Sequence, residues 1–293
     1  MRLSLPLLYA FLALVLVGCA SSNAGAAGSP PTTFIENKGS DTMVNLALAW
    51  AEAYQSVEPQ VSVSVTGGGS GTGITALANN TVDIANASRA IKDEEIAAMQ
   101  KNGIDPLEFT VARDAIAVIV NLNNPVERLT LPQISDIYSG KITNWSEVGG
   151  EDRPIVRLSR ETNSGTHVYF LEEVLRLGDS DNETFFSANT LLLPSSEGIT
   201  AEVRDNPNAI GYDGLGYVVP EVKVLAVAAA GGDYFYPSVD TVNDLTYPIA
   251  RDLYMYTAGA PSDVEQAYLD WIFSAPAQAI VAELGFVPVS GQP

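Results

Sequence analysis

Three stretches rich in glycine, serine and threonine contain the residues whose types and spacing could do chemistry. They are KGSDTM (38–43), GGGSGTGI (67–74) and SRETNSGTH (159–167). Each follows a segment predicted to be extended and comes directly before a predicted helix. The first N–H groups of a helix have no partner within it, and this end carries about half a positive charge. Glycines let a ligand approach the backbone and hydroxyls add rotatable donors, so the pattern predicts an anion site.

Helix capping is the alternative interpretation of each stretch, since Ser, Thr and Asp are the usual residues at helix starts. Three such stretches, one of which carries Arg160, favour a shared site over three separate caps. Arginine can hold a tetrahedral oxyanion through two parallel charge-assisted hydrogen bonds.

Several other function classes are disfavoured by composition. The net charge of -20 argues against a nucleic-acid partner, which needs a basic surface. The glycine run does not fit G-x-G-x-x-G, because Thr72 or Ile74 stands at its last place, and no Walker lysine follows. The only histidine, His167, is predicted to be a surface or capping residue, and the only cysteine is Cys19. We therefore expect no catalytic residue, no metal site and no cofactor.

The order of the predicted elements indicates an α/β fold with a mostly parallel sheet, because short apolar strands alternate with amphipathic helices. A chain of 293 residues with 46% hydrophobic residues can form one large domain or two modest ones. The predicted strands include 61–65, 115–121, 155–159 and 252–257. The predicted helices are 42–56, 72–79, 93–101, 132–138, 165–177, 197–204 and 262–283.

The first 18 residues are typical of an export signal peptide, with one arginine followed by an apolar run. A transmembrane anchor is the alternative, but the run is shorter than the roughly 20 residues of a spanning helix. LVGC (16–19) resembles the bacterial lipoprotein processing box, which predicts a lipidated Cys19 at the start of the mature chain. Residues 19–33 form a small, polar linker that can hold the domain off a membrane.

Six motifs in order resemble the phosphate-binding protein of bacterial Pst-type ABC transporters. They are GSDT, GGGSGTGI, NNTVDIANASRAIKDEE, IYSGKITNW, SRETNSGT and NPNAIGYDGLGYV. The resemblance implies a type II periplasmic-binding-protein fold, in which two α/β lobes are joined by hinge strands with the ligand in the cleft. Lobe one would comprise 34–113 and 250–293, and lobe two 114–249, with hinges near 111–115 and 247–251.

The resemblance also implies a set of phosphate-binding residues. Those expected here are Ser40, Asp41, Thr42, Ser70, Arg89, Arg160, Ser164, Gly165 and Thr166. Two of them depart from the family. Asp41 stands where the family has a threonine, and Arg89 stands where well-studied members have an aspartate that accepts the phosphate proton. Our hypothesis is that Asp41 supplies this acceptor while Arg89 supplies compensating charge. The alternative is that Asp41 only caps a helix and pairs with Arg89.

The implied function is that of an exported, lipid-anchored and monomeric binding protein, periplasmic or at the cell surface. It would capture inorganic phosphate and deliver it to the membrane permease subunits of an ABC transporter, without being an enzyme. The alternatives are another tetrahedral oxyanion, such as sulfate or molybdate, and a phosphate sensor without transport. A phosphatase would need a nucleophile with a base, or a metal.

Overall fold

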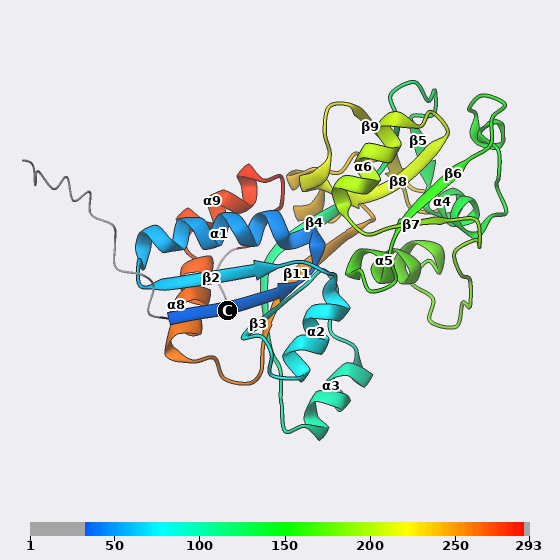
Figure 1. The fold of residues 1–293 in the computed structure, drawn as a ribbon. Helices are drawn as coiled ribbons and strands as arrows, with labels where there is room; N and C mark the ends of the chain where they lie inside the picture. The colour runs from blue at the N-terminus through cyan, green and yellow to red at the C-terminus, as the bar shows by residue number, and fades with distance from the viewer. Residues whose placement is uncertain (1–32, 290–293) are drawn as a thin grey trace, which may run out of the picture. The chain divides into compact units, whose positions relative to one another are not determined.

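The computed structural model describes residues 33–289 of the chain, and Figure 1 shows how their elements are arranged. The predicted signal peptide 1–18, the lipidation site Cys19 and the linker up to residue 32 lie outside the described residues. Between residues 33 and 289, no helix combines the length and the apolar character needed to cross a membrane.

One half of the main sheet is built on three parallel strands. Their order is β2 (Val61–Thr66), β1 (Thr33–Gly39) and β3 (Ile84–Ala87). The late strand β11 (Ala250–Thr257) pairs with β3 in the antiparallel direction. This half of the sheet is therefore completed by residues from the C-terminal part of the chain.

Helices cover both faces of this half because successive side chains of a strand point to opposite sides. In β11, Leu253 and Met255 belong to one core cluster, whereas Tyr256, on the other face, belongs to a second. The first cluster includes helices α1 (Val44–Val57), α8 (Asp263–Ile272) and α9 (Ala275–Glu283), and the second includes α2 (Ser70–Ala78) and α3 (Asp93–Lys101).

The long strand β4 (Leu107–Asn121) runs through both halves of the sheet. Its residues 107–115 pair with β11, and its residues 116–120 pair with β8 (Ala209–Gly214). Next to β8 come β6 (Val156–Arg160) and then the edge strand β7 (Leu191–Leu193), while β9 (Val222–Val224) pairs with the end of β4. The strands β5 (Arg128–Thr130) and β10 (Ala226–Ala228) form a small separate sheet.

The second half has its own core around Tyr138, Phe170 and Tyr212, whose rings contact one another. Its helices are α4 (Leu131–Ser139), α5 (Gly165–Tyr169), α6 (Ser196–Asp205) and α7 (Val239–Asn243). α5 continues directly into the π-helix η3 (Phe170–Leu175). Short 3-10 turns are η1 (Asp41–Met43), η2 (Trp145–Val148) and η4 (Leu215–Tyr217).

Two predicted elements differ most from the structure. The single helix expected at 262–283 is two helices, because the backbone is extended at Ser274, the residue before α9, and Pro276 in the first turn of α9 cannot continue α8. The strand expected at 115–121 begins earlier, at Leu107, because its first part pairs with β11, a strand far away in the sequence.

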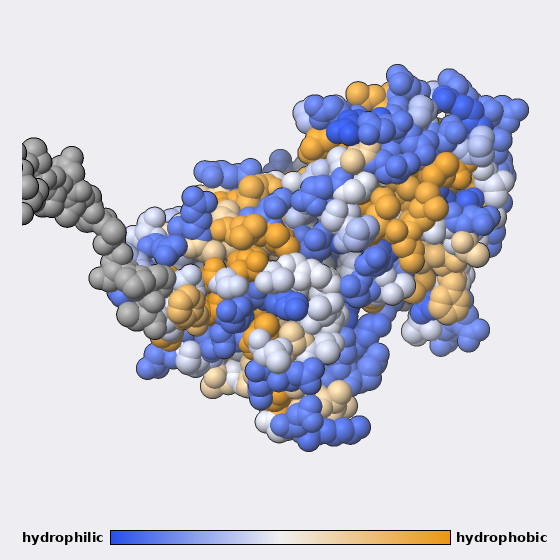
Figure 2. Space-filling model, in the orientation of Figure 1, coloured by the Kyte–Doolittle hydropathy of each residue, from blue (hydrophilic) through white to orange (hydrophobic). Residues whose placement is uncertain are grey.

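The surface in the view of Figure 2 is mostly hydrophilic, with hydrophobic patches between the polar regions. Exposed hydrophobic side chains include Leu191 and Leu192 of the edge strand β7. The polar surface agrees with the acidic composition of the chain.

Candidate anion-binding site

The three glycine, serine and threonine stretches meet where the two halves of the sheet join. Thr42, beside the start of α1, has its Oγ1 2.9 Å from Oγ1 of Thr166 in the first turn of α5. Gly71, in the first turn of α2, donates its backbone N–H to the carbonyl of Asn163 at 3.1 Å. The starts of three helices far apart in the sequence therefore face one another across a buried contact.

Glycine is required on both sides of this contact. A Cβ on Gly165 would lie 2.3 Å from Ser70 Oγ and 2.6 Å from Ser88 Oγ. Gly69 has a φ of +92°, and a Cβ there would lie 2.7 Å from the Asn163 carbonyl oxygen. Close approach of backbone to backbone thus explains the glycine-rich sequence.

The buried residues at these helix starts form what we call the cradle. It consists of Ser40, Thr42, Ser70, Arg160, Ser164, Gly165 and Thr166, all of which are buried. Within it, Ser70 Oγ accepts a hydrogen bond from the Ser88 N–H at 3.0 Å, and Ser164 Oγ accepts one from the Thr166 N–H at 3.2 Å. The buried hydroxyl of Ser40 has no hydrogen-bond partner among the described residues.

Arg160 is held by residues from the starts of two helices. Its Nη2 lies 3.0 Å from Asp41 Oδ2 and donates to the Pro194 carbonyl at 2.8 Å, while its Nη1 donates to Ser196 Oγ at 2.7 Å. The Ser196 N–H also donates to Asp41 Oδ2, at 3.1 Å. Asp41, Arg160 and Ser196 therefore form one network, and Arg160 Nε remains buried without a partner in the described part of the chain.

Behind Arg160 lies a fully buried carboxyl group, that of Asp213 in β8. Its Oδ1 accepts hydrogen bonds from Ser196 Oγ and from the Gly214 N–H, both at 2.8 Å. Burial raises the pKa of Asp213 to about 7, although Arg160 and these hydrogen bonds act to lower it. The protonation state of this carboxyl group therefore changes near neutral pH.

Arg89 does not pair with Asp41, in contrast to the link that we considered from the sequence. Its two Nη atoms bind the two carboxylate oxygens of Glu95 at 2.7 Å each. Burial acts to raise the pKa of Glu95, but the hydrogen bonds and charge of Arg89, with help from Lys92, hold it below the usual value. The charge of Arg89 is thus compensated by α3, and that of Asp41 by Arg160.

His167 is buried, so the predicted surface or capping role is wrong. Its Nδ1 lies 3.0 Å from Ser159 Oγ, and its ring stacks on Phe186 at 4.5 Å. Burial lowers the pKa of His167, which favours the neutral ring. Its nearest polar partner, Ser159, is bound in turn to the Tyr212 hydroxyl at 2.6 Å. These contacts give His167 a packing role.

Sequence reasoning missed Ser88, Ser196, Asp213, Asp114 and Arg251. Ser195 and Ser196 come directly before the predicted helix 197–204, so the same pattern of hydroxyls before a helix could have identified this fourth helix start. Arg251 and Asp114 lie within strands and carry no such local signal. Arg251 Nη2 nevertheless reaches Thr166 Oγ1 at 2.9 Å.

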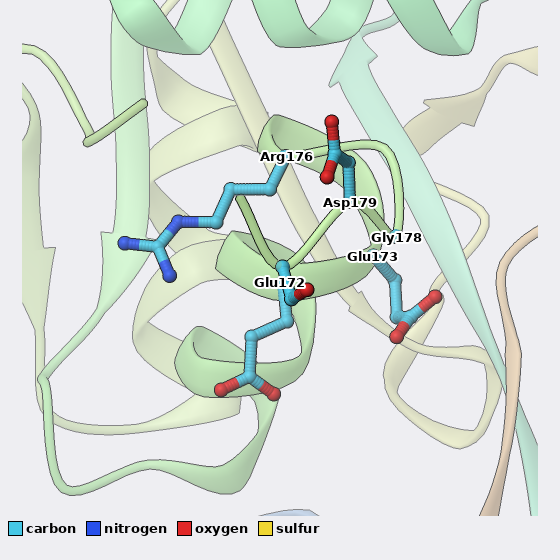
Figure 3. Close-up of a pocket in the computed structure, with 6 residues that line it drawn as sticks. Glu172, Glu173, Arg176, Gly178 and Asp179 are labelled. Carbon is cyan, nitrogen blue, oxygen red and sulfur yellow. The ribbon is translucent and has the colours of Figure 1, made fainter. Parts of the chain in front are cut away.

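Surface pockets lie outside the cradle. One, of about 270 Å³, is at the end of η3, where the side chains of Glu172, Glu173, Arg176 and Asp179 point in different directions (Figure 3). Since these charged groups do not converge, this pocket is not built to hold a single ion. A second, of about 340 Å³, lies beside the cradle and is lined in part by Arg89, Tyr169 and Arg251.

The cradle can hold an anion by hydroxyl groups, helix N-termini and one arginine, all of which donate hydrogen bonds. The described residues show no cluster of His, Cys, Asp and Glu that could hold a metal. A buried set of donors at the junction of two half-sheets, with β4 and β11 passing between them, defines a solute-binding protein. The chain belongs to the PBP superfamily, whose domain model matches residues 24–276, and within it to the PstS family of phosphate-binding proteins.

Relatives and solved structures agree with this assignment. The phosphate-binding protein PstS of Pseudomonas aeruginosa is 32% identical over 98% of this chain and 96% of its own length. PstS of Bacillus subtilis is 29% identical over 99% of this chain and 94% of its own length. A putative phosphate ABC transporter substrate-binding protein of Clostridium perfringens, solved with bound phosphate, is 34% identical and superposes with a TM-score of 0.78 over 87% of this chain and 99% of that chain. The family and the type II periplasmic-binding-protein fold predicted from the sequence are confirmed.

Proposed function

We propose that this protein binds inorganic phosphate in the cradle and delivers it to the membrane permease subunits of an ABC transporter, as an extracytoplasmic binding protein and not as an enzyme. The observation that carries this proposal is the meeting of three helix starts with Arg160. An oxyanion placed there would receive short, directional hydrogen bonds, which suits an acidic protein that cannot attract anions at long range.

The site residues inferred from the sequence keep their places in this proposal. Thr42, Ser70, Ser164, Gly165 and Thr166 would donate to the anion, and Arg160 would bind it through its guanidinium group. Ser40, whose buried hydroxyl has no hydrogen-bond partner between residues 33 and 289, would contribute a further donor. Arg89 would act at a distance, because its guanidinium group is already bound to Glu95.

Asp41 is proposed to accept the proton that phosphate retains and sulfate lacks. Its contacts with Arg160 and with the Ser196 N–H both use Oδ2, which leaves Oδ1 for the ligand. A carboxylate facing an anion without a proton has no partner, which costs about 1 to 3 kcal/mol or more. The carboxylate of Asp41 would therefore favour phosphate over sulfate.

Lobe boundaries, export, anchoring and oligomeric state complete the proposal. Lobe one comprises 34–113 and 250–293, lobe two comprises 114–249, and both hinges lie where β4 and β11 pair near Asp114 and Arg251. Residues 1–18 direct export, and a lipidated Cys19 anchors a monomer to the membrane through the linker 19–33. Cys19→Ser should release the protein from the membrane fraction and abolish its labelling by a radioactive fatty acid.

Isothermal titration of the ligand-stripped protein with phosphate and then sulfate, between about pH 5 and 8.5, tests the ligand assignment. We expect phosphate to bind at least about a hundredfold more tightly, a difference of about 2.7 kcal/mol. Asp41→Asn should narrow this difference, mainly by strengthening sulfate binding. If the wild type bound sulfate or molybdate as tightly as phosphate or more tightly, the assignment of phosphate as the ligand would be wrong. If Asp41→Asn left the selectivity for phosphate over sulfate unchanged, Asp41 would not be the proton acceptor. Phosphate binding without stimulation of uptake in membrane vesicles containing the permease would indicate a sensor.

A further inference from the structure

Arg251, which the sequence did not single out, lies at the junction of the two half-sheets and reaches into the cradle. Its side chain is buried, and β11 places it opposite Asp114 of β4. Nη1 donates to the Ser88 carbonyl at 2.8 Å, and Nη2 lies 2.9 Å from both Asp114 Oδ2 and Thr166 Oγ1. The same Nη2 lies 3.5 Å from Thr42 Oγ1.

The guanidinium group is fixed on several sides. Besides the Nη2 contact, Nε lies 3.3 Å from Asp114 Oδ2, and the other oxygen of Asp114 accepts the Leu215 N–H at 3.2 Å. The ring of Tyr169 lies 5.6 Å from the guanidinium carbon of Arg251. Arg251 therefore has little freedom to move relative to the strands that connect the two halves.

This geometry determines which way the threonine hydroxyl groups point. A guanidinium group has no acceptor, so Thr166 Oγ1 must accept at its contact with Arg251, and its single hydrogen is left to donate. Thr42 and Thr166 lie 2.9 Å apart and share one hydrogen bond, whichever of them donates. One hydroxyl hydrogen of the pair is then left over, and it can be given only to a third group.

We propose that Arg251 is a positioning residue that orients the hydroxyl groups of Thr42 and Thr166 so that the pair donates its one remaining hydrogen to the bound anion. This inference rests on the proposed phosphate site. Without Arg251 the two hydroxyl groups could rotate and form other hydrogen-bonding arrangements, which would weaken their interaction with an acceptor. Because Thr42 comes from one half of the sheet and Thr166 from the other, the oriented pair exists only when the halves are in contact.

A double-mutant cycle tests whether Arg251 acts through Thr166. Removal of Arg251 alone would leave Asp114 buried and unpaired, so the neutral pair Arg251→Gln with Asp114→Asn is used. We expect this pair and Thr166→Val each to weaken phosphate binding by about tenfold to a hundredfold in isothermal titration of the full chain, as expected for one hydrogen bond to a charged group. Their combination should weaken binding by no more than about threefold beyond the larger single effect.

Two further variants complete the design. Arg157→Gln removes another buried arginine, which donates to the carbonyls of Ile137 and Ile142 away from the cradle; it should lower thermal stability but not phosphate affinity. Arg251→Lys keeps the charge but loses the planar fork of the guanidinium group, and this variant should bind phosphate more weakly than the wild type.

The inference is overturned if the effects of Arg251 and Thr166 multiply, if Arg251→Lys binds phosphate like the wild type, or if Arg157→Gln weakens binding equally. Failure of the wild-type protein to bind phosphate would instead overturn the proposed function. The two failures are thus distinguishable, because each variant's affinity for phosphate is compared with the measured affinity of the wild type.

Discussion

Gly165→Ala adds a single atom, the Cβ of residue 165, between the two lobes, and so tests their proposed closure over the anion. The added Cβ would lie 2.3 Å from Ser70 Oγ and 3.1 Å from Ser70 Cβ, whereas ordinary contact begins at 3.4 Å. Rotation of the serine hydroxyl cannot relieve the contact with its Cβ. Unless Ser70 and Ser88 leave their present rotamers, the Oγ contacts keep the lobes about 1 Å too far apart here, although hydrogen bonds in proteins span only about 2.7 to 3.2 Å.

The expected magnitude follows from the usual cost of overpacking, about 1 to 3 kcal/mol, which corresponds to a loss of about 5-fold to 150-fold in phosphate affinity. The clash lies between the lobes, so the thermal stability of the ligand-free protein should be nearly unchanged. Isothermal titration of ligand-stripped protein gives the affinity, and small-angle X-ray scattering reports whether phosphate still compacts the molecule.

Gly232→Ala is the matched control, because its Cβ would meet nothing closer than 3.6 Å and its backbone does not require glycine. We expect this control to bind like the wild type. Wild-type affinity in Gly165→Ala would refute the reasoning, since the closed arrangement could then not be the one that binds the anion. An equal loss in both variants would point to a general effect of the substitution.

Three other perturbations test separate parts of the structure. The pKa of Asp213 is about 7 in the folded state, which is above the value of an aspartate in the unfolded state. Between about pH 4 and 7 the folded state therefore holds one more proton than the unfolded state. The resulting contribution to stability is lost as pH rises through that window, by up to about 1.4 kcal/mol per pH unit. Asp213→Asn should remove this slope in urea denaturation series in phosphate-free buffer, and an unchanged slope would assign it to other groups. Arg160→Lys should weaken phosphate binding about tenfold to a hundredfold because lysine cannot reproduce the fork, and titration showing less than a twofold loss would exclude fork binding. Leu46→Ala, in the core packed by α1, should lower the free energy of unfolding by about 2 to 5 kcal/mol in urea without changing affinity; a parallel loss of affinity would contradict the separation of core and cradle.

Sequence patterns predicted well what depends on neighbours along the chain. The helix expected at 93–101 matches α3 residue for residue, and hydroxyls before predicted helices identified the starts of α1, α2 and α5. The break between α8 and α9 also had a local signal, Ser274 followed by Pro276, which the longer apolar pattern obscured.

Pairings between distant residues could not be predicted in this way. Asp41 meets Arg160, and Arg251 meets Asp114, across more than a hundred residues in each case, and each partner carries the same local pattern as an ordinary strand or loop residue. The burial of His167 depends likewise on Phe186, which arrives from a loop without regular structure. Sequence alone therefore indicated the class of ligand but not the partner of each charge.

The order in which the two cores can form follows from the late arrival of β11, α8 and α9. The core around Tyr138 draws on residues 115–249 and, beyond them, Val287, whereas the core around Trp50 combines residues from 35–112 and Tyr217 with residues from 253–286. The Trp50 indole N–H donates to the Ala277 carbonyl at 2.9 Å, across 227 positions of the chain. During synthesis, the face of β1, β2 and β3 that packs against α1, α8 and α9 can be fully covered only after residues 253–286 have been made, and such long-range closure is slow. For a chain that we propose is exported, the late closure of this face would favour passage through a narrow channel before folding is complete.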